Sequence, residues 1–134
     1  EIRPELAKAA RPDCIIATGR SDYPNQVNNV LCFPYIFRGA LDCGATKITD
    51  AMKIACVREI ADLAKLEVTA EVQAAYPGLD LAFGVDNIIP KPFDTRLMFR
   101  IAPAVARAAE ASGVAKRPIK DFEAYAKTLA TWLK

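Results

Sequence analysis

The sequence predicts an α/β fold in which helices cover a parallel sheet, with one or two of the strands inside these 134 residues. A short apolar segment, Cys14–Thr18, is closed by Gly19 and is typical of a buried strand. A second strand-like segment, residues 87–93, lies between helical segments, and such alternation favours a parallel sheet. Because one or two strands cannot make a complete sheet, we expect the chain to be the back part of such a domain, mostly helical in itself.

Helices are predicted from residues that start or stop them. Prolines suited to a first turn, N-cap side chains and glycines suited to a helix end predict helices over residues 3–10, 33–44, 50–65, 69–76, 95–112 and 121–133. Thr49 and Asp94 are the expected caps of the third and fifth of these, and Pro103 predicts a kink in the fifth. The last segment carries one apolar stripe, made by Phe122, Tyr125, Leu129 and Trp132.

Composition excludes several classes of protein. The net charge of +2 and the scattered basic residues argue against nucleic-acid or anionic-membrane partners. No apolar run approaches the roughly 20 residues of a membrane span, and no signal peptide opens the chain. The four cysteines lack metal-site spacing and the chain has no histidine, so we expect reduced core thiols in a cytoplasmic protein. The start, without Met and just before a helix, suggests one piece of a longer enzyme.

The glycines do not form a nucleotide-binding loop. Gly39 and Gly44 have phosphate-loop spacing, but Ala45 follows where Lys is required. No two glycines are separated by a single residue, so a pyrophosphate-binding loop would have to lie outside this chain. The commonest general base is also missing, because there is no histidine.

Four side-chain amides gather in the loop that leads into the second predicted helix: Asn25, Gln26, Asn28 and Asn29. This loop follows the carboxyl end of the predicted strand, where ligands of open α/β sheets bind. A helix N-terminus favours anions, and Asn offers neutral N–H donors that can orient one. Alternatively, Asn28 or Asn29 only caps the helix. Composition and spacing leave both readings open.

The segment "IIATGRSDYPNQVNNVLCFPYIFRGALDCGATKITDAMKIACVREIADLA" resembles the cofactor-binding domain of the large bacterial NADP-dependent malic enzymes. "IIPKPFDTRL" and "IAPAVARAAEASGVAKRPI" continue the resemblance, which extends from Glu1 to about Asp121. It implies that residues 1–134 are the C-terminal portion of a Rossmann-like NAD(P)-binding domain. It also implies oxidative decarboxylation of (S)-malate to pyruvate, with NADP or NAD and with Mg²⁺ or Mn²⁺ bound outside this chain.

The resemblance assigns binding roles but no catalytic residue. It implies that Asn29 contacts a substrate carboxylate, that Asn28 lies beside it near the nicotinamide, and that Gly19 contacts the cofactor. Both amides are therefore expected to face a cleft rather than the core. The family's general acid and base, a Tyr and a Lys, belong to a part of the enzyme absent here, and Tyr23, Tyr35 and Lys47 do not match their motifs. The chain alone is expected to be inactive.

The expected partners are (S)-malate or pyruvate, the remainder of the malic enzyme polypeptide, and further copies in a homo-oligomer. The choice between NADP and NAD is left open by the sequence. So is the presence of a phosphotransacetylase-like domain. Residues 121–133 are either the helix that leads to it or a terminal helix that packs on the present domain. The alternative function is a non-catalytic helical interaction module that reuses the fold.

Overall fold

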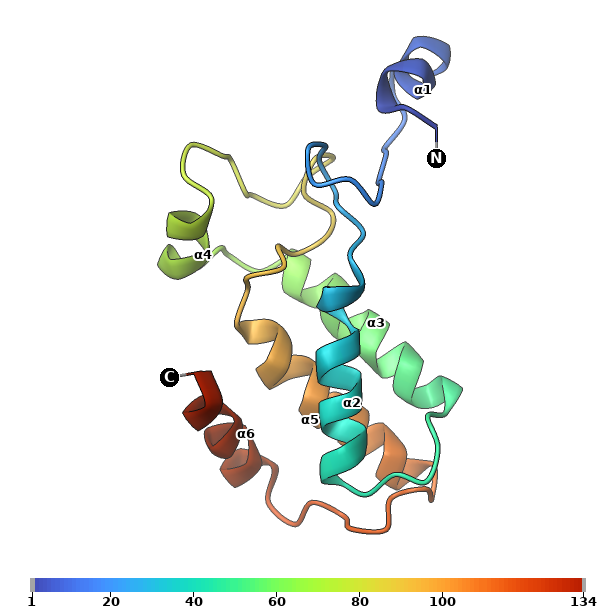
Figure 1. Ribbon diagram of the computed structural model, residues 1–134, viewed down its shortest axis with the longest axis vertical. Coiled ribbons are helices and arrows are strands. Elements are labelled where there is room, and N and C mark those ends of the chain that lie inside the picture. Colours follow the sequence, from blue (N-terminus) through green and yellow to red (C-terminus); the bar gives the residue numbers. More distant parts are fainter. Residues whose placement is uncertain (1, 134) are drawn as a thin grey trace.

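The computed structural model describes residues 2–133, which form six α-helices and two 3₁₀ helices (Figure 1). In chain order these are α1 (Pro4–Ala10), η1 (Asn29–Leu31), α2 (Phe33–Asp42), α3 (Asp50–Ala64), α4 (Ala70–Ala75), α5 (Arg96–Ala111), α6 (Phe122–Ala130) and η2 (Thr131–Leu133). Each of the six predicted helices is therefore confirmed, with ends that differ by a few residues. None of the helices in residues 2–133 is long and apolar enough to cross a membrane.

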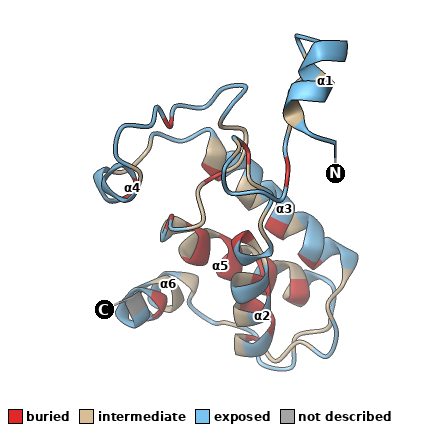
Figure 2. Cartoon of the chain, turned by 45° about the horizontal axis from the view of Figure 1, so that its top comes forward, coloured by how far each residue is buried: buried red, intermediate tan, exposed pale blue. Residues whose placement is uncertain are grey.

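Helix α5 is the centre of the packing, and α2, α3 and α6 lie against it (Figure 2). Its buried face includes Leu97, Ile101 and Val105, which are wholly removed from solvent. Met52, Cys56 and Leu63 of α3 and Ile36 and Ala40 of α2 complete the main core. Burying a large apolar side chain contributes about 1.5–3 kcal/mol, so these helices are stabilised mainly by burial.

The predicted helix ends at Thr49 and Gly113 are confirmed, whereas Asp94 does not occupy the predicted N-cap position. The Thr49 hydroxyl accepts a hydrogen bond from the Met52 N–H at 3.3 Å and so caps α3. Asp94 lies one residue before the N-cap position of α5 and accepts from the Arg96 N–H at 3.0 Å. Gly113 follows α5 with φ of 69°, a conformation that glycine adopts without strain. Helix α5 continues through Pro103, and a kink there stays a prediction.

The predicted strands do not form within residues 2–133. Cys14–Thr18 is extended, but it makes only an isolated parallel bridge between Thr18 and Gln26, in which the Val27 N–H donates to the Thr18 carbonyl at 2.7 Å. Residues 87–93 contribute only one residue to a second isolated bridge, between Gly84 and Asn87. A parallel strand needs a neighbouring strand along its whole length, and the described residues supply none for either segment.

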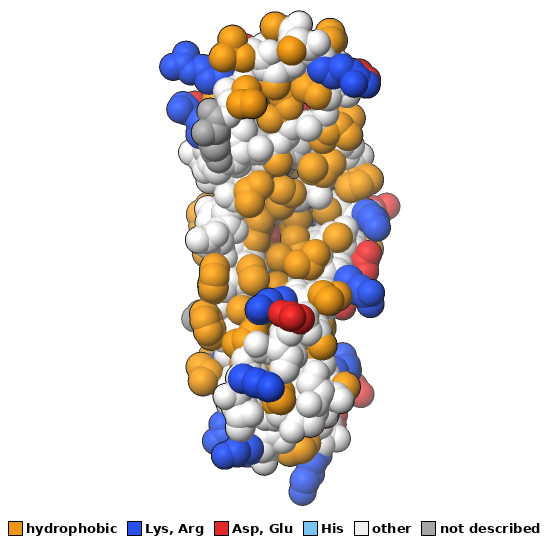
Figure 3. Space-filling model, turned by 90° about the vertical axis from the view of Figure 1, so that its right-hand side faces the viewer, with side chains coloured by type: hydrophobic (Ala, Val, Ile, Leu, Met, Phe, Trp, Pro, Cys, Tyr) orange, Lys and Arg blue, Asp and Glu red, His pale blue; other side chains and the backbone are white. Residues whose placement is uncertain are grey.

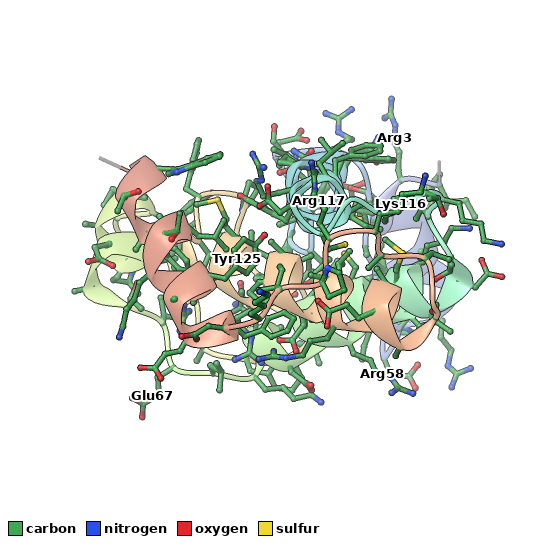
Figure 4. The ribbon with its side chains drawn as sticks, turned by 90° about the horizontal axis from the view of Figure 1, so that it is seen from below. Arg3, Arg58, Glu67, Lys116, Arg117 and Tyr125 are labelled. Atoms are coloured by element: carbon green, nitrogen blue, oxygen red, sulfur yellow. The ribbon has the colours of Figure 1, made fainter. Side chains whose placement is uncertain are left out.

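The final helix packs on the core through mixed contacts. Leu129 is buried, and the Tyr125 hydroxyl donates to Asp42 Oδ2 at 2.7 Å, which joins α6 to the end of α2. Figure 4 labels Tyr125 on α6 and Arg117 beside α2, where the Arg117 guanidinium donates to the Leu41 carbonyl at 2.8 Å. Trp132 departs from the predicted stripe because 56% of it is exposed, and its ring lies under the Arg38 guanidinium instead.

All four cysteines are free thiols, but the prediction that they lie in the core holds for only two of them. Cys43 and Cys56 are buried, whereas Cys14 and Cys32 are partly accessible. The Cys56 thiol donates to the Cys32 sulfur at 3.3 Å, between α3 and the start of α2. Burial raises the pKa of Cys56, so this thiol stays protonated at neutral pH.

The N-terminal end of the chain is more exposed to solvent than the helical core. Helix α1 projects away from the helical core in Figure 1, and none of its residues is buried. The Tyr23 hydroxyl donates to Glu5 Oε1 at 2.6 Å and joins α1 to the loop that follows the extended segment. Hydrophobic side chains are also prominent on the outer surface shown in Figure 3.

Candidate functional site

The candidate site is the loop that runs from Gly19 to Asn29 and enters α2 through the short helix η1. At its end, the Asn28 side-chain oxygen accepts a hydrogen bond from the Val30 N–H at 3.0 Å. Asn28 has extended backbone angles and is thus the N-cap of η1. The capping reading therefore holds for Asn28, and its second role beside a cofactor stays a prediction.

Asn29 is in a different position. It is the first residue of η1, it is exposed, and its carbonyl accepts from the Cys32 N–H at 3.1 Å. Among the described residues its side-chain amide has no hydrogen-bond partner, so the whole amide is available to a ligand. Capping thus accounts for Asn28 and leaves Asn29 unexplained by local structure.

Asn25 has a structural role that the sequence reasoning missed. It is only 2% exposed and has φ of 56°, the one positive φ of a non-glycine residue in residues 2–133. Its side-chain NH₂ donates to the carbonyls of Ile16, at 3.0 Å, and Val85, at 2.7 Å. Its side-chain oxygen accepts from the Ile88 N–H at 2.9 Å. The Pro24-Asn25 pair, typical of a turn with positive φ at its second central residue, was the available signal.

Besides a cleft of about 360 Å³ that is lined by Tyr23 and Pro24 together with residues of the N-terminal segment, the loop borders two further clefts. One, of about 480 Å³, is lined by residues from the N-terminal segment and by Thr18, Arg20 and Tyr23, next to the exposed Gly19. The other, of about 410 Å³, is lined by Gln26 together with Tyr76 and Lys91 among others. None of these clefts is lined by Asn28 or Asn29. The predicted cleft at these two asparagines is thus not formed by the described residues alone.

Charges around the loop are mostly paired locally. Arg20 forms an ion pair with Asp22 and lies over the Tyr23 ring, 5.4 Å from its centroid. The hydrogen bond to Arg20 lowers the pKa of Asp22 and keeps that carboxylate ionised. In the second cleft, burial lowers the pKa of Lys91, whose ammonium lies 5.9 Å from the centroid of Tyr76.

A metal centre is not formed by the part of the chain that the structure describes. No three Asp, Glu, Cys or His side chains of residues 2–133 lie close enough together to hold an ion. The buried carboxylate of Asp94 forms an ion pair with Arg96, so its negative charge is balanced by that guanidinium.

Comparison of the fold with solved structures defines the class of protein. The chain is similar to the crystal structure of malic enzyme from Pyrococcus horikoshii Ot3, with a TM-score of 0.77 and 42% identity over 98% of this chain and 26% of that one. It is also similar to Entamoeba histolytica malic enzyme, with a TM-score of 0.75 and 35% identity over 98% of this chain and 24% of that one. Residues 11–89 match the family model described as "Malic enzyme, NAD binding domain". The chain belongs to this family.

Curated relatives agree with this assignment. The chain is 64% identical over 133 residues to the NADP-dependent malic enzyme of Salmonella typhimurium, covering 99% of this chain and 18% of that protein. It is 65% identical over 125 residues to the NAD-dependent malic enzyme of Rhizobium meliloti, covering 93% of this chain and 16% of that protein. The chain thus spans less than a fifth of the length of these two relatives. Their names also include both cofactors, so the choice between NADP and NAD stays open.

Proposed function

We propose that this chain is the C-terminal portion of the NAD(P)-binding domain of a malic enzyme. The complete enzyme would oxidise (S)-malate and decarboxylate the product to pyruvate and CO₂, with reduction of NADP or NAD. The family match over residues 11–89 carries this proposal, and the 64% identity to a named NADP-dependent malic enzyme supports it. The remainder of the polypeptide would supply the catalytic acid and base and the ligands of Mg²⁺ or Mn²⁺.

Asn29 is the residue of this chain that we assign to the substrate. Its exposed amide has no partner among the described residues, and it stands where a helical segment begins. A neutral N–H donor can orient a malate carboxylate without adding charge of its own. The hydrogen bond would be charge-assisted, and such bonds are shorter and stronger than those between neutral groups.

The residues present fit only one end of a nicotinamide cofactor. Gly19 is exposed beside a cleft, and Asn28 immediately precedes the proposed substrate ligand, so both suit the nicotinamide end. A glycine-rich loop for the pyrophosphate is not part of this sequence. Such a cofactor would supply the hydride acceptor for malate. Asn29 would hold the substrate carboxylate, and Asn28 fixes the start of η1.

Asn29→Ala in the complete enzyme tests the assignment. If Asn29 donates to a malate carboxylate, its loss removes about 1.5–3 kcal/mol and lowers kcat/KM for malate by roughly 10- to 150-fold. The KM for the cofactor should change much less, because the rest of the cofactor is bound outside this chain. Steady-state kinetics and a melting curve on the same variant provide the two measurements.

Gln26→Ala is the matched control. It removes an amide from the same loop, but Gln26 lines a cleft to which Asn29 does not contribute, so malate kinetics should stay close to normal. A lowered melting temperature of Asn29→Ala with unaltered malate kinetics would make Asn29 a structural residue and contradict the site assignment. Equal losses in both variants would point to a general disturbance of the loop.

A further inference from the structure

We infer that Asn25 is the positioning residue of this site: its buried side chain sets where Asn29 stands, although Asn25 itself contacts no substrate. The inference rests on the proposed role of Asn29 and adds a second residue to it. Asn25 is four positions before Asn29, at the point where the loop turns back toward the extended segment.

Three hydrogen bonds fix Asn25 to two distant parts of the chain. Its NH₂ group donates to Ile16 in the extended segment and to Val85, 60 residues away, at 3.0 and 2.7 Å. Its oxygen accepts from the Ile88 N–H at 2.9 Å. All three partners are backbone groups, so their positions are set by the course of the chain and do not change with side-chain rotamers. One side chain therefore joins three segments.

The backbone at Asn25 is also restricted. A φ of 56° is tolerated by Asn and Gly but disfavoured for most other residues. The residue is 2% exposed, so its donors and acceptor would be costly to leave without partners. Conformation and hydrogen bonding thus both select Asn at this position. A surface loop with no positional task would require neither.

The fixed position of Asn25 is passed on to Asn29 through short, bonded steps. Two residues after Asn25, the Val27 N–H donates to the Thr18 carbonyl at 2.7 Å. Asn28 then caps η1 through the Val30 N–H at 3.0 Å, and Asn29 begins that helix. About every second residue of this stretch makes a hydrogen bond, so the backbone between Asn25 and the side-chain amide of Asn29 has little conformational freedom. A displacement of Asn25 is therefore expected to displace Asn29.

A double-mutant cycle on the complete enzyme tests the inference. Asn25→Gly keeps the positive φ accessible and removes all three hydrogen bonds, so it isolates the bonds from the backbone conformation. Misplacing a substrate-binding group by about 1 Å can cost up to about 100-fold, so kcat/KM for malate should fall by roughly 10- to 100-fold. In the Asn29→Ala background the same change should cost less than about 3-fold, because the displaced group is already absent.

Two further variants keep the test decisive. Asn25→Asp retains the acceptor for Ile88 and serves if the glycine variant does not fold. Its loss of kcat/KM should likewise be non-additive with that of Asn29→Ala. Thr49→Ala is the control for stability, because it removes a helix cap away from the loop and should leave malate kinetics unchanged. Cofactor KM should stay within about 3-fold for every variant, since the site is displaced only at its substrate end.

The outcomes separate the inference from the proposed function. Non-additive losses in the cycle, with cofactor KM maintained, support Asn25 as a positioning residue. Additive losses, or a lowered melting temperature of Asn25→Gly with normal malate kinetics, overturn that role and leave Asn29 as the substrate ligand. Normal malate kinetics of Asn29→Ala alone would overturn the proposed site, and the inference with it.

Discussion

The helical part and the loop part of this chain are held together in different ways. In the helical part, α2, α3 and α6 bury apolar side chains against α5, and the largest of these are wholly removed from water. In the loop part, residues 11–28 and 76–93, large apolar side chains are exposed: 57% for Ile15, 61% for Val85 and 73% for Phe93. The loops are joined by hydrogen bonds, chiefly those of the buried side chain of Asn25.

This difference shows which part of the chain is stabilised by its own buried contacts. A single hydrogen bond contributes about 0.5–1.5 kcal/mol net, whereas the buried face of α5 combines several side chains at about 1.5–3 kcal/mol each. The helical part can therefore keep its structure by burial alone. The loop part depends on a few directional bonds, so local opening should be easier there. The proposed substrate residue, Asn29, stands at the boundary between the two parts.

The largest effect is expected from Leu97→Ala, a core truncation in the helical part. Leu97 is fully buried, and removing such a side chain costs about 2–5 kcal/mol of unfolding free energy. Ile15→Ala is the matched change in the loop part and should cost less than about 0.5 kcal/mol. Urea unfolding of the 134-residue chain measures both. Similar costs for the two variants would contradict the division into a buried and an exposed part.

Tyr125→Phe should have the next largest effect. It removes the hydroxyl that donates to Asp42, and a hydrogen bond to a charged acceptor is worth about 1.5–3 kcal/mol, with the lower end expected for this partly exposed pair. The attachment of α6 to the core should weaken, while α3 and α5 stay folded. Hydrogen exchange of the α6 amides relative to those of α5 would reveal this, and equal protection in wild type and variant would contradict it.

The same tyrosine predicts a dependence on pH. Burial raises the pKa of Tyr125 to about 12, above the value of about 10 for an exposed tyrosine. The unfolded chain therefore loses this proton first, so the contribution of Tyr125 is complete below about pH 10 and is lost as pH rises toward 12. The stability difference between wild type and Tyr125→Phe should shrink between about pH 10 and pH 12. A constant difference over this interval would be the contrary result.

The smallest effect is expected from Thr49→Ala. The Thr49 hydroxyl caps α3 through the Met52 N–H, and loss of such a cap typically costs about 1 kcal/mol. Thr95 is a close control, because it occupies the N-cap position of α5 but makes no capping hydrogen bond with its side chain. Thr95→Ala should thus be almost neutral in the same unfolding experiment. Equal costs would mean that the hydroxyl of Thr49 is not what stabilises α3.

The helices could be predicted because their determinants are local. Thr49 starts α3 with its own hydroxyl, and Gly113 ends α5 through its own backbone freedom. Each signal lies within a few residues of the element that it controls. The predicted strand Cys14–Thr18 is wrong for the opposite reason, because strand pairing depends on neighbours that this sequence does not contain.

The candidate site could be predicted only in part. The crowding of amides drew attention to the right loop, and the N-cap role of Asn28 follows from its place before a helical turn. The structural role of Asn25, as opposed to the exposed amide of Asn29, could not be predicted. The hydrogen-bond partners of Asn25 include Val85 and Ile88, more than 50 residues further along the chain. Contacts at such a separation are set by the packed helices between them.

At Gly39, helix α2 comes close to α5. A Cβ atom at this position in α2 would lie 2.4 Å from the Ala102 carbonyl oxygen of α5, so the two helices touch here backbone to backbone. Helix α2 has ten residues and is about 15 Å long, and its N-terminal end carries η1 and Asn29. Forcing the helices apart at Gly39 would tilt α2 like a lever about its contact with α5. Because Gly39 has no Cβ, α2 can lie close to α5. The position of the Asn29 amide, at the N-terminal end of α2, therefore depends on this glycine.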